Sequence, residues 1–172
     1  MISSFAEYNN CGNVIQFDFN ECLTTLKRMH PSNVTAGGYG EMEMYKDTIP
    51  ALVNAMPSWI KSRLKTFSVY AWDTGTNSLT EVENNKLALR ARVEMYGPGN
   101  LASDAEGSIV SLYSKIPDFR RKYTGYARSS YTYLWTRTPY NANQCYLVYA
   151  GNGNQDRSNL VDARGIAPFG CM

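Results

Sequence analysis

The alternation of apolar and polar residues along the chain predicts a series of short β-strands. Half-buried strands place every second side chain in the core, and several stretches follow this period. The predicted strands span residues 14–19, 66–74, 86–97, 131–138, 145–150 and 165–172. The polar residues 75–85 interrupt the pattern and predict a loop.

Two neighbouring segments have the spacing of helices. Residues 41–56 begin with acidic side chains, which suit the positive end of a helix dipole, and they place apolar residues on one face. Pro50 should kink this helix or divide it in two, because proline has no N–H to donate. Pro57 then opens a second helical run, 57–65, at the first-turn position where proline is tolerated.

A later segment, 103–122, is helical in pattern as far as Pro117. Ser103 and Glu106 have the spacing of a capping box, which predicts the start of that helix. The order of strands and helices predicts an α+β fold, with two or more helices packed on short mixed or antiparallel strands. The chain has 172 residues without an internal repeat or linker, so one domain, 1–172, is expected.

Composition argues against several classes of partner. The hydrophobic fraction of 44% and charged fraction of 19% are typical of a globular chain, and no apolar run approaches the roughly 18 residues of a membrane span. The N-terminus lacks the basic and apolar regions of a signal peptide. A net charge of +2 with scattered Lys and Arg argues against nucleic acid, and the basic cluster 118–123 is expected to be a solvated helix end.

Little in the sequence supports an enzyme or a metal site. The only histidine, His30, is the sole candidate base for a nucleophile, and it is expected on the surface. Asn152, Asn154 and Asp156 alternate like the start of a calcium loop, but the glycine and the distal glutamate of such a loop are missing. No catalytic residue, metal or cofactor is therefore predicted. Without CxxC spacing or a secretion signal, free buried thiols are favoured over two disulfides for Cys11, Cys22, Cys145 and Cys171.

The last 50 residues differ in composition from the rest of the chain. They contain no lysine, glutamate or histidine, but seven of the 13 tyrosines. Contact surfaces lose Lys and Glu and gain Tyr and Arg, because rigid rings give up little entropy on binding. A tyrosine-rich sheet would show the same bias, so composition leaves both interpretations open. Tyr146 and Tyr149 have opposite parity in the strand 145–150, and Tyr149 is expected to point outward.

Residues 133–171 resemble the C-terminal signature of a large family of domains from gut bacteria and their phages, which runs roughly W-L-R-S-P, a variable stretch, a "YV…G" strand, and G-V-R/A-P-A-F. The matching residues are Trp135, Arg137, Thr138, Pro139, Val148, Gly165, Ile166, Ala167, Pro168 and Phe169. Segments 29–65 and 84–97 are also similar to that family. The anchors among these residues are expected to be structural: Trp135 and Phe169, with Ile166 and Val148, in the core, Arg137 donating to buried loop carbonyls, and Pro139, Gly165 and Pro168 holding the backbone.

This resemblance implies a C-type-lectin-like fold of the formylglycine-generating-enzyme type. It also implies kinship with the variable proteins of diversity-generating retroelements, many of which are phage tail adhesins or bacterial surface ligand binders. The variable segment would span about 135–165, with Gln144 and Gln155 expected as fixed positions. The implied ligand-binding residues are Tyr140, Asn141, Asn143, Tyr146, Tyr149, Asn152, Asn154, Arg157, Ser158 and Asn159.

The sequence is compatible with three functions. The leading one is a receptor-binding module of a virion or cell surface, whose partner is a protein or glycan receptor on a bacterial host. The second is a structural virion protein that uses the same surface to pack against copies of itself or other tail proteins. The third, an oxidase, is disfavoured because the two-cysteine copper spacing of that enzyme type has no counterpart here, and neither do the motifs of calcium-dependent lectins.

Overall fold

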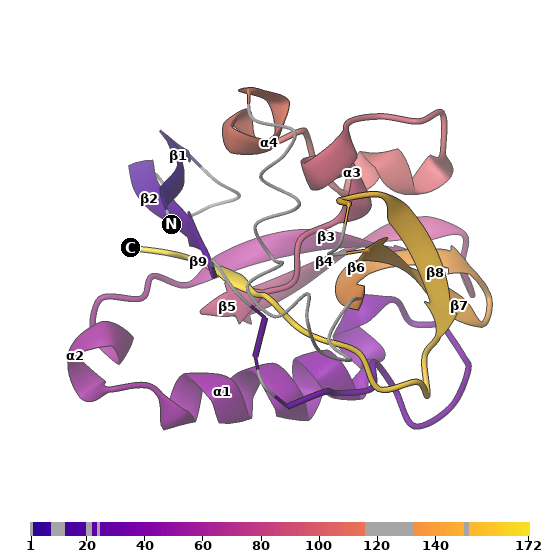
Figure 1. The fold of residues 1–172 in the computed structure, drawn as a ribbon, viewed down its shortest axis with the longest axis horizontal. Helices are drawn as coiled ribbons and strands as arrows, with labels where there is room; N and C mark the ends of the chain where they lie inside the picture. The colour runs from indigo at the N-terminus through magenta and orange to yellow at the C-terminus, as the bar shows by residue number, and fades with distance from the viewer. Residues whose placement is uncertain (1, 8–12, 20–21, 24, 116–132, 150–151) are drawn as a thin grey trace.

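A computed structural model describes residues 2–7, 13–19, 22–23, 25–115, 133–149 and 152–172. In this part of the chain, short helices and three antiparallel sheets form an α+β fold, as predicted (Figure 1). The strands are β1 (Ile2–Glu7), β2 (Asn13–Asp18), β3 (Phe67–Asp73), β4 (Ser78–Asn85), β5 (Leu87–Ala88), β6 (Tyr133–Asn141), β7 (Gln144–Tyr149), β8 (Gln155–Asn159) and β9 (Phe169–Cys171). The α-helices are α1 (Ile49–Ala55), α2 (Ser58–Lys61), α3 (Arg92–Tyr96) and α4 (Ser111–Lys115). Turns of 3₁₀-helix at Tyr39–Glu41 and Ala102–Glu106 and a π-helical turn at Met44–Thr48 accompany them.

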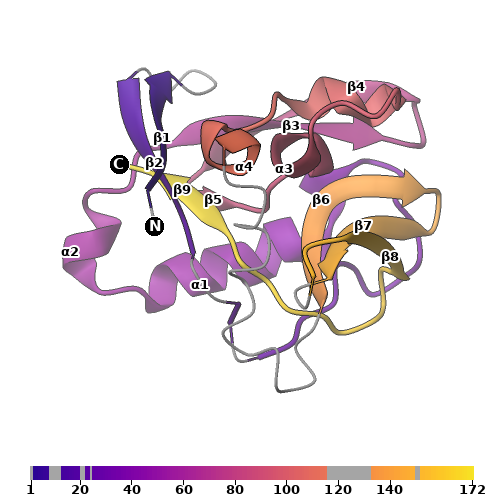
Figure 2. The same ribbon diagram turned by 45° about the horizontal axis from the view of Figure 1, so that its top comes forward.

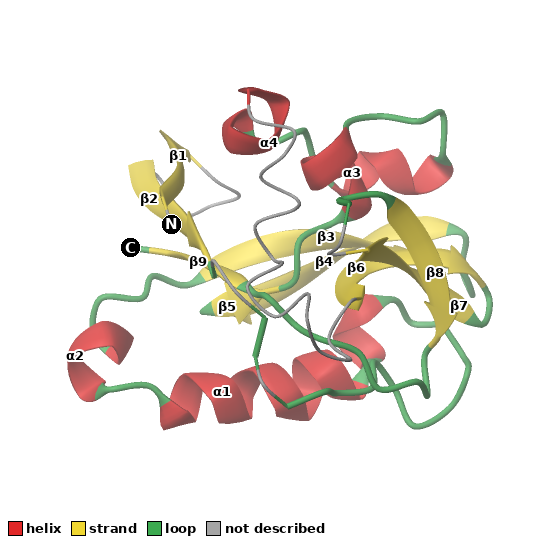
Figure 3. Cartoon of the chain, viewed as in Figure 1, coloured by secondary structure: helices red, strands yellow, loops and turns green. Residues whose placement is uncertain are grey.

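The described strands form three separate sheets. The first sheet has the order β1-β2-β9-β5 and joins the first and last strands of the chain; β3-β4 and β6-β7-β8 form the other two. Helix α1 lies on one side of the sheets, and α3 and α4 lie on the other (Figure 3). Sheet β6-β7-β8 lies at the opposite end of the molecule from α2 and the two termini (Figures 1 and 2).

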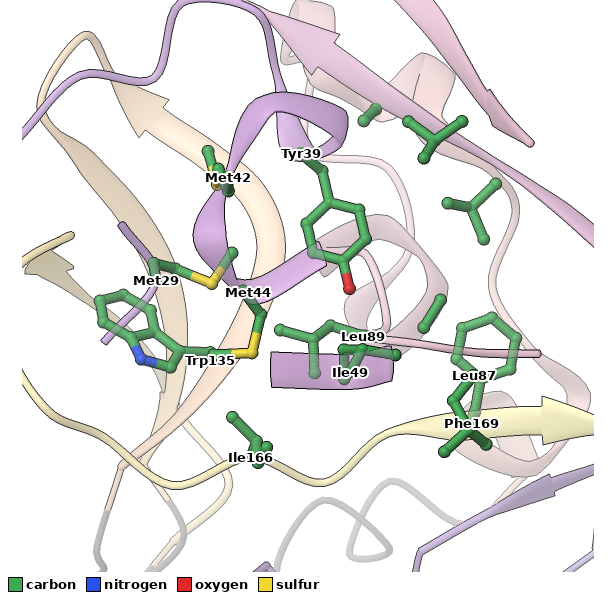
Figure 4. Close-up of a cluster of buried hydrophobic side chains, with 14 of the residues drawn as sticks. Met29, Tyr39, Met42, Met44, Ile49, Leu87, Leu89, Trp135, Ile166 and Phe169 are labelled. Carbon is green, nitrogen blue, oxygen red and sulfur yellow. The ribbon is translucent and has the colours of Figure 1, made fainter. Parts of the chain in front are cut away.

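The main core joins residues from every part of the described chain. Met29 and Met44 lie beside Trp135, whose indole N–H donates to the carbonyl of Lys27 at 2.8 Å (Figure 4). The predicted core residues Trp135, Val148, Ile166 and Phe169 are all buried, so this expectation is confirmed. A second cluster, which includes Met95 of α3 and Tyr113 of α4, packs on Leu134 and Val148 from the other side of β6-β7.

The first predicted helix is not divided at Pro50, because a π-helical turn leads without a break into α1. The π-helical turn Met44–Thr48 precedes it, and α1 begins at Ile49 with Pro50 in its first turn. A wider turn accommodates a residue that cannot donate an N–H. The second predicted run, 57–65, is helical at Ser58–Lys61 directly after Pro57.

The strand predicted over 86–97 is wrong for most of its length. Only Leu87–Ala88 is a strand, and Arg92–Tyr96 forms α3. Glu94 reaches back to accept from the backbone N–H of Ala91 at 2.7 Å, which starts the helix, and Gly97 at φ 77 ends it. The alternation misled the prediction because the polar residues in it are buried in ion pairs instead of facing water.

Three observed strands were not predicted from the sequence. β4 occupies most of 75–85; only two of its residues, Val82 and Asn85, are buried, so it has no apolar alternation to detect. β8 lies within the predicted variable segment, and four of its five residues are exposed. β1 at the N-terminus was not predicted. Exposed strands of small sheets carry the weakest sequence signal.

The helix predicted over 103–122 begins differently. Ala102–Glu106 is a 3₁₀ turn, and α4 follows only at Ser111–Lys115; the rest of the prediction, the basic cluster 118–123 included, lies outside the described residues. Ser103 and Glu106 form no capping box. Asp104 instead accepts from the backbone N–H of Leu101 at 2.9 Å, while Glu106 is buried elsewhere.

The predicted anchor Gly165 is needed because of its close packing. It pairs with Leu134 across a parallel bridge, and a Cβ atom there would lie 2.9 Å from the Leu134 side chain and 3.2 Å from the Tyr133 carbonyl. We expect Gly165→Ala to lower the free energy of unfolding by about 1–3 kcal/mol through overpacking, measured by urea denaturation. The exposed Ala163→Ser, which also adds one heavy atom, is the control and should change it by less than about 0.5 kcal/mol. Equal effects of the two substitutions would contradict this role.

Candidate ligand-binding face

A bulge in β6 directs a buried arginine into the molecule. Trp135 pairs with Leu147 and Pro139 with Cys145, so residues 136–138 lie opposite the single residue Tyr146. Extra residues in one strand re-aim side chains, and here Arg137 at the centre of the bulge is fully buried.

Arg137 holds four segments together through its guanidinium. It donates to the carbonyls of Tyr70 at 2.9 Å, Leu89 at 2.7 Å and Glu106 at 3.1 Å. It also donates twice to the Glu94 carboxylate, at 2.8 and 3.1 Å. The prediction that Arg137 satisfies buried carbonyls is therefore confirmed, and the ion pair with Glu94 adds to it.

Glu106 is a second buried carboxylate in this network. It accepts from the backbone N–H of Trp72 at 2.7 Å and from the Thr138 hydroxyl. Burial raises the pKa of Glu106 to about 7, although Arg137 and these two hydrogen bonds oppose the shift. The carboxyl group therefore titrates near neutral pH, inside the scaffold of β6.

This raised pKa predicts a stability that increases on acidification. Between the ordinary pKa of 4.5 and the folded value of about 7, the folded state binds a proton that the unfolded state has lost. The Glu106 contribution should therefore fall as the pH rises through this window, by at most about 1.4 kcal/mol per pH unit. Asp73 has a lowered pKa, so its contribution is lost only below its ordinary value of 3.8, outside the window.

Urea denaturation at about pH 5 and about pH 7.5 tests this expectation. The free energy of unfolding of the wild type minus that of the Glu106→Gln variant should decline toward the higher pH, because a glutamine side chain has no proton to lose in this range. A difference that is constant across the two pH values would show that Glu106 does not titrate in this window.

The outer surface of β6-β7-β8 carries a patch of rings, amides and one guanidinium. In the register of β7 and β8, Tyr146 lies opposite Arg157 and Gln144 opposite Asn159. Alternation along the two strands puts these side chains on one face. We name this patch the Tyr–Arg face and define it as Tyr140, Gln144, Tyr146, Gln155, Arg157 and Asn159.

The aromatic groups of the Tyr–Arg face hold one another in place. Tyr140, which is 40% exposed, meets Tyr146 edge to face with ring centroids 5.2 Å apart. Arg157 lies over the Tyr140 ring at 4.4 Å and donates to its hydroxyl at 2.5 Å. Partial burial raises the pKa of Tyr146, which keeps its phenol neutral near physiological pH. The face thus presents ordered rings with few rotamers left to lose on contact.

Arg92 connects the Tyr–Arg face to the buried scaffold. Its guanidinium lies 5.7 Å from the Tyr146 ring and donates to Gln155 at 2.9 Å. It also pairs with Asp104 at 2.8 Å, and its backbone N–H donates to the buried Thr138 hydroxyl at 2.8 Å. The face is therefore held in place by α3 as well as by β6.

The ten predicted ligand-binding residues do not form one surface. Tyr140, Tyr146, Arg157 and Asn159 lie on the Tyr–Arg face, Asn141 ends β6 opposite Gln144, and Asn143 lies in the adjoining β6–β7 turn. Asn152 and Asn154 lie in the turn at the other end of β7.

Two of the predicted residues belong to the opposite side of the sheet. Tyr149 has the parity of Leu147 and its half-buried ring contacts Tyr133 with centroids 5.0 Å apart, so it lies off the Tyr–Arg face. Ser158 is buried and its hydroxyl donates to Asp162 at 2.5 Å, which corrects its assignment as a contact residue. β8 was not recognised as a strand, so its parity could not separate Ser158 from Arg157.

Three residues of the site were missed by sequence reasoning. Gln144 and Gln155 lie on the Tyr–Arg face, and pairing β7 with a strand at 155–159 would have found them, because both have the parity of Tyr146 and Arg157. Arg92 gave no signal, since it lies 52 or more positions before β7 and β8 and was assigned to a strand of its own.

The described cysteines are buried, and the described acidic residues do not gather into a metal cluster. Cys22, Cys145 and Cys171 are buried thiols, as predicted, whereas Cys11 lies outside the described residues. Burial raises the pKa of the Cys145 thiol well above its ordinary value, which leaves it protonated and unreactive at neutral pH. Within the described ranges, no three His, Cys, Asp or Glu side chains cluster as a metal site.

Two of the three residues with calcium-like spacing accept hydrogen bonds from backbone N–H groups. A side-chain oxygen of Asn152 accepts from the N–H of Asn154 at 2.9 Å, and one of Asp156 accepts from the N–H of Arg157 at 2.8 Å. These bonds are those of tight turns and a strand edge.

No family model matches the chain, and neither a curated protein nor a solved structure shows significant similarity to it. Among the residues described, no helix has the length and apolar character to cross a membrane.

Proposed function

We propose that this protein is a binding module that recognises an external ligand through the Tyr–Arg face. The observation that carries the proposal is the ordered, half-exposed cluster of Tyr140, Tyr146 and Arg157. Tyr and Arg are the residues that dominate binding energy at protein surfaces, and a preorganised cluster pays less entropy on binding. Loops and strand surfaces held by a rigid scaffold can vary in sequence without loss of the fold.

The resemblance to C-type-lectin-like domains supports a more specific form of this proposal. The motif residues Trp135, Arg137 and Phe169 are buried, and the half-buried positions of β7 and the exposed positions of β8 lie between them in the sequence. This pattern fits a variable protein of a diversity-generating retroelement, displayed on a phage tail or a cell surface and binding a bacterial host, with no catalytic function. A reverse transcriptase gene beside a near-copy of the codons for 135–165, differing at adenines, would test the retroelement directly.

Binding of the labelled protein to a panel of bacterial cells tests the proposed function. We expect Tyr140→Ala and Tyr146→Ala each to weaken binding by about 30-fold, which corresponds to a contact worth roughly 2 kcal/mol. The control is Trp59→Ala, which removes an aromatic side chain that is 63% exposed on α2, at the other end of the molecule (Figure 2).

Two outcomes would redirect the proposal. If both tyrosine variants bind cells like the wild type, the Tyr–Arg face is not the ligand site. If they bind cells normally but fail to assemble into particles, the alternative function as a structural virion protein gains support.

A further inference from the structure

Arg157 is an exposed cation whose position is already fixed. Its guanidinium is held by the Tyr140 hydroxyl at 2.5 Å and by the Tyr140 ring at 4.4 Å, directly across the strand pair from Tyr146. An arginine side chain normally loses rotamer freedom when it binds a partner. Here the cation–π contact and the hydrogen bond have restricted that freedom before any ligand arrives, so the guanidinium is ready to donate to an acceptor outside the molecule.

The charge of Arg157 has no carboxylate counterpart within the described structure. Most other arginines there pair with an acid: Arg28 with Glu43, Arg90 with Asp18, Arg92 with Asp104, Arg137 with Glu94 and Arg164 with Asp162. The other described arginine without such a pair is Arg63, which lies 6.0 Å from the Trp59 ring. The acid next in sequence, Asp156, accepts from the backbone N–H of Arg157 and has the opposite parity on β8.

The surroundings of Arg157 are uncharged and rich in hydrogen-bonding groups. The other residues of the Tyr–Arg face are two tyrosines, two glutamines and an asparagine, and Arg92 beside them is neutralised by Asp104. The face therefore has one unmatched positive charge, set between aromatic rings that exclude water and amides that can pair with backbone groups. A carboxylate placed there would form a charge-assisted hydrogen bond in a partly desolvated site.

We propose that the ligand of the Tyr–Arg face is a protein surface that presents an aspartate or glutamate carboxylate to Arg157, next to apolar groups that pack on Tyr140 and Tyr146. This inference rests on the proposed function, since it names the chemistry of the partner at the same site. A protein is favoured over an acidic glycan because a face of Tyr, Arg, Asn and Gln, without Lys or Glu, has the composition of protein contact surfaces.

Selection from a random dodecapeptide library displayed on phage tests the proposal. The immobilised full-length protein is the bait, and Arg157→Gln is compared with Arg63→Gln, which removes the same charge from another exposed, ring-stacked arginine at the far end of the molecule. We expect the enriched peptides to contain an Asp or Glu, and their affinity to fall about tenfold or more for Arg157→Gln but less than twofold for Arg63→Gln. Changing the peptide acid to its amide should cost as much, with no further loss on the Arg157→Gln protein.

Each other outcome contradicts a different part of the account. Peptides that lose affinity for Tyr140→Ala but not for Arg157→Gln would overturn the acidic partner and leave the face as the binding site. Peptides that bind all variants alike, or no enrichment at all, would count against the proposed function itself. Tighter binding of polygalacturonate, an acidic polysaccharide, than of any enriched acidic peptide would overturn the protein partner in favour of a glycan.

Discussion

Replacement of Arg137 by methionine is expected to lower the free energy of unfolding by about 3–5 kcal/mol. The substitution keeps an apolar stem of similar length but leaves the Glu94 carboxylate buried without its cation, and breaking one partner out of a buried pair costs this much. The carbonyls of Tyr70 and Leu89 lose their donor as well. Since small domains are stable by about 5–15 kcal/mol, the variant should be partly unfolded or easily denatured.

Urea denaturation followed by circular dichroism measures this effect, with Arg157→Met as the matched control. Arg157 is exposed and stacked on one ring, so its replacement should cost less than about 1 kcal/mol. The double variant Arg137→Met/Glu94→Gln should be less destabilised than the sum of its single variants, because no unpaired charge remains buried. Similar stability of the two methionine variants would rule out a structural role for the bulge in β6.

Replacement of Asp18 by asparagine is the second substitution for which a large loss is expected, again about 3–5 kcal/mol. Asp18 on β2 accepts from Arg90 at 2.9 and 2.8 Å and from the Tyr113 hydroxyl at 3.1 Å, and both charged side chains are buried. Burial tends to lower the pKa of Arg90, but Asp18 more than offsets this and the pKa is raised overall, so the cation persists at all accessible pH values. The pair joins β2 to the segment before α3, and Arg90 also stacks on Phe169 of β9 at 3.7 Å.

The control for this pair is Asp162→Asn. Asp162 pairs with Arg164 at 3.3 Å, and both side chains are about one third exposed. Its loss should change the free energy of unfolding by less than about 1 kcal/mol, because exposed ion pairs contribute little. If Asp18→Asn is no more destabilising than Asp162→Asn in thermal or urea unfolding, the buried pair does not hold the first sheet to α3.

The sequence predicted the residues that make the scaffold better than those that make the surface. Trp135, Phe169 and Ile166 are core residues because large apolar side chains have few alternatives to burial. Arg137 was predicted to serve buried carbonyls, since a motif arginine with five donors suits irregular backbone. The α+β class followed from the order of predicted elements, although several boundaries moved.

The errors at 86–97 and at the start of the helix predicted over 103–122 have a common cause, which is the burial of polar groups. In the segment 86–97, polar residues alternate with apolar ones as they do in a strand with one solvent-facing side. The structure instead buries Arg90, Arg92 and Glu94 in ion pairs. Glu106 imitated a capping residue for a similar reason. Such partners come from distant segments, and hydrophobic periodicity contains no information about them.

The site was predicted in part because composition marks a region but not a face. The bias toward Tyr and Asn pointed to residues 140–159, whereas the parity of β8 decides that Arg157 faces outward and Ser158 inward. β8 has too few apolar residues to be recognised as a strand. Gln144 and Gln155 were set aside as fixed positions, and the register of β7 and β8 places them on the Tyr–Arg face.

The most direct test of the account is the binding of one triple variant, Tyr140→Ser/Tyr146→Ser/Arg157→Ser, to the bacterial cells that the wild type recognises. Because these side chains contact mainly one another and Arg92, the variant should remain folded, with a loss of less than about 2 kcal/mol in unfolding free energy. We predict that its affinity for the cells falls more than about 100-fold, since the contacts that dominate binding are gone. A folded triple variant that binds these cells as tightly as the wild type would contradict the assignment of the Tyr–Arg face as the ligand site.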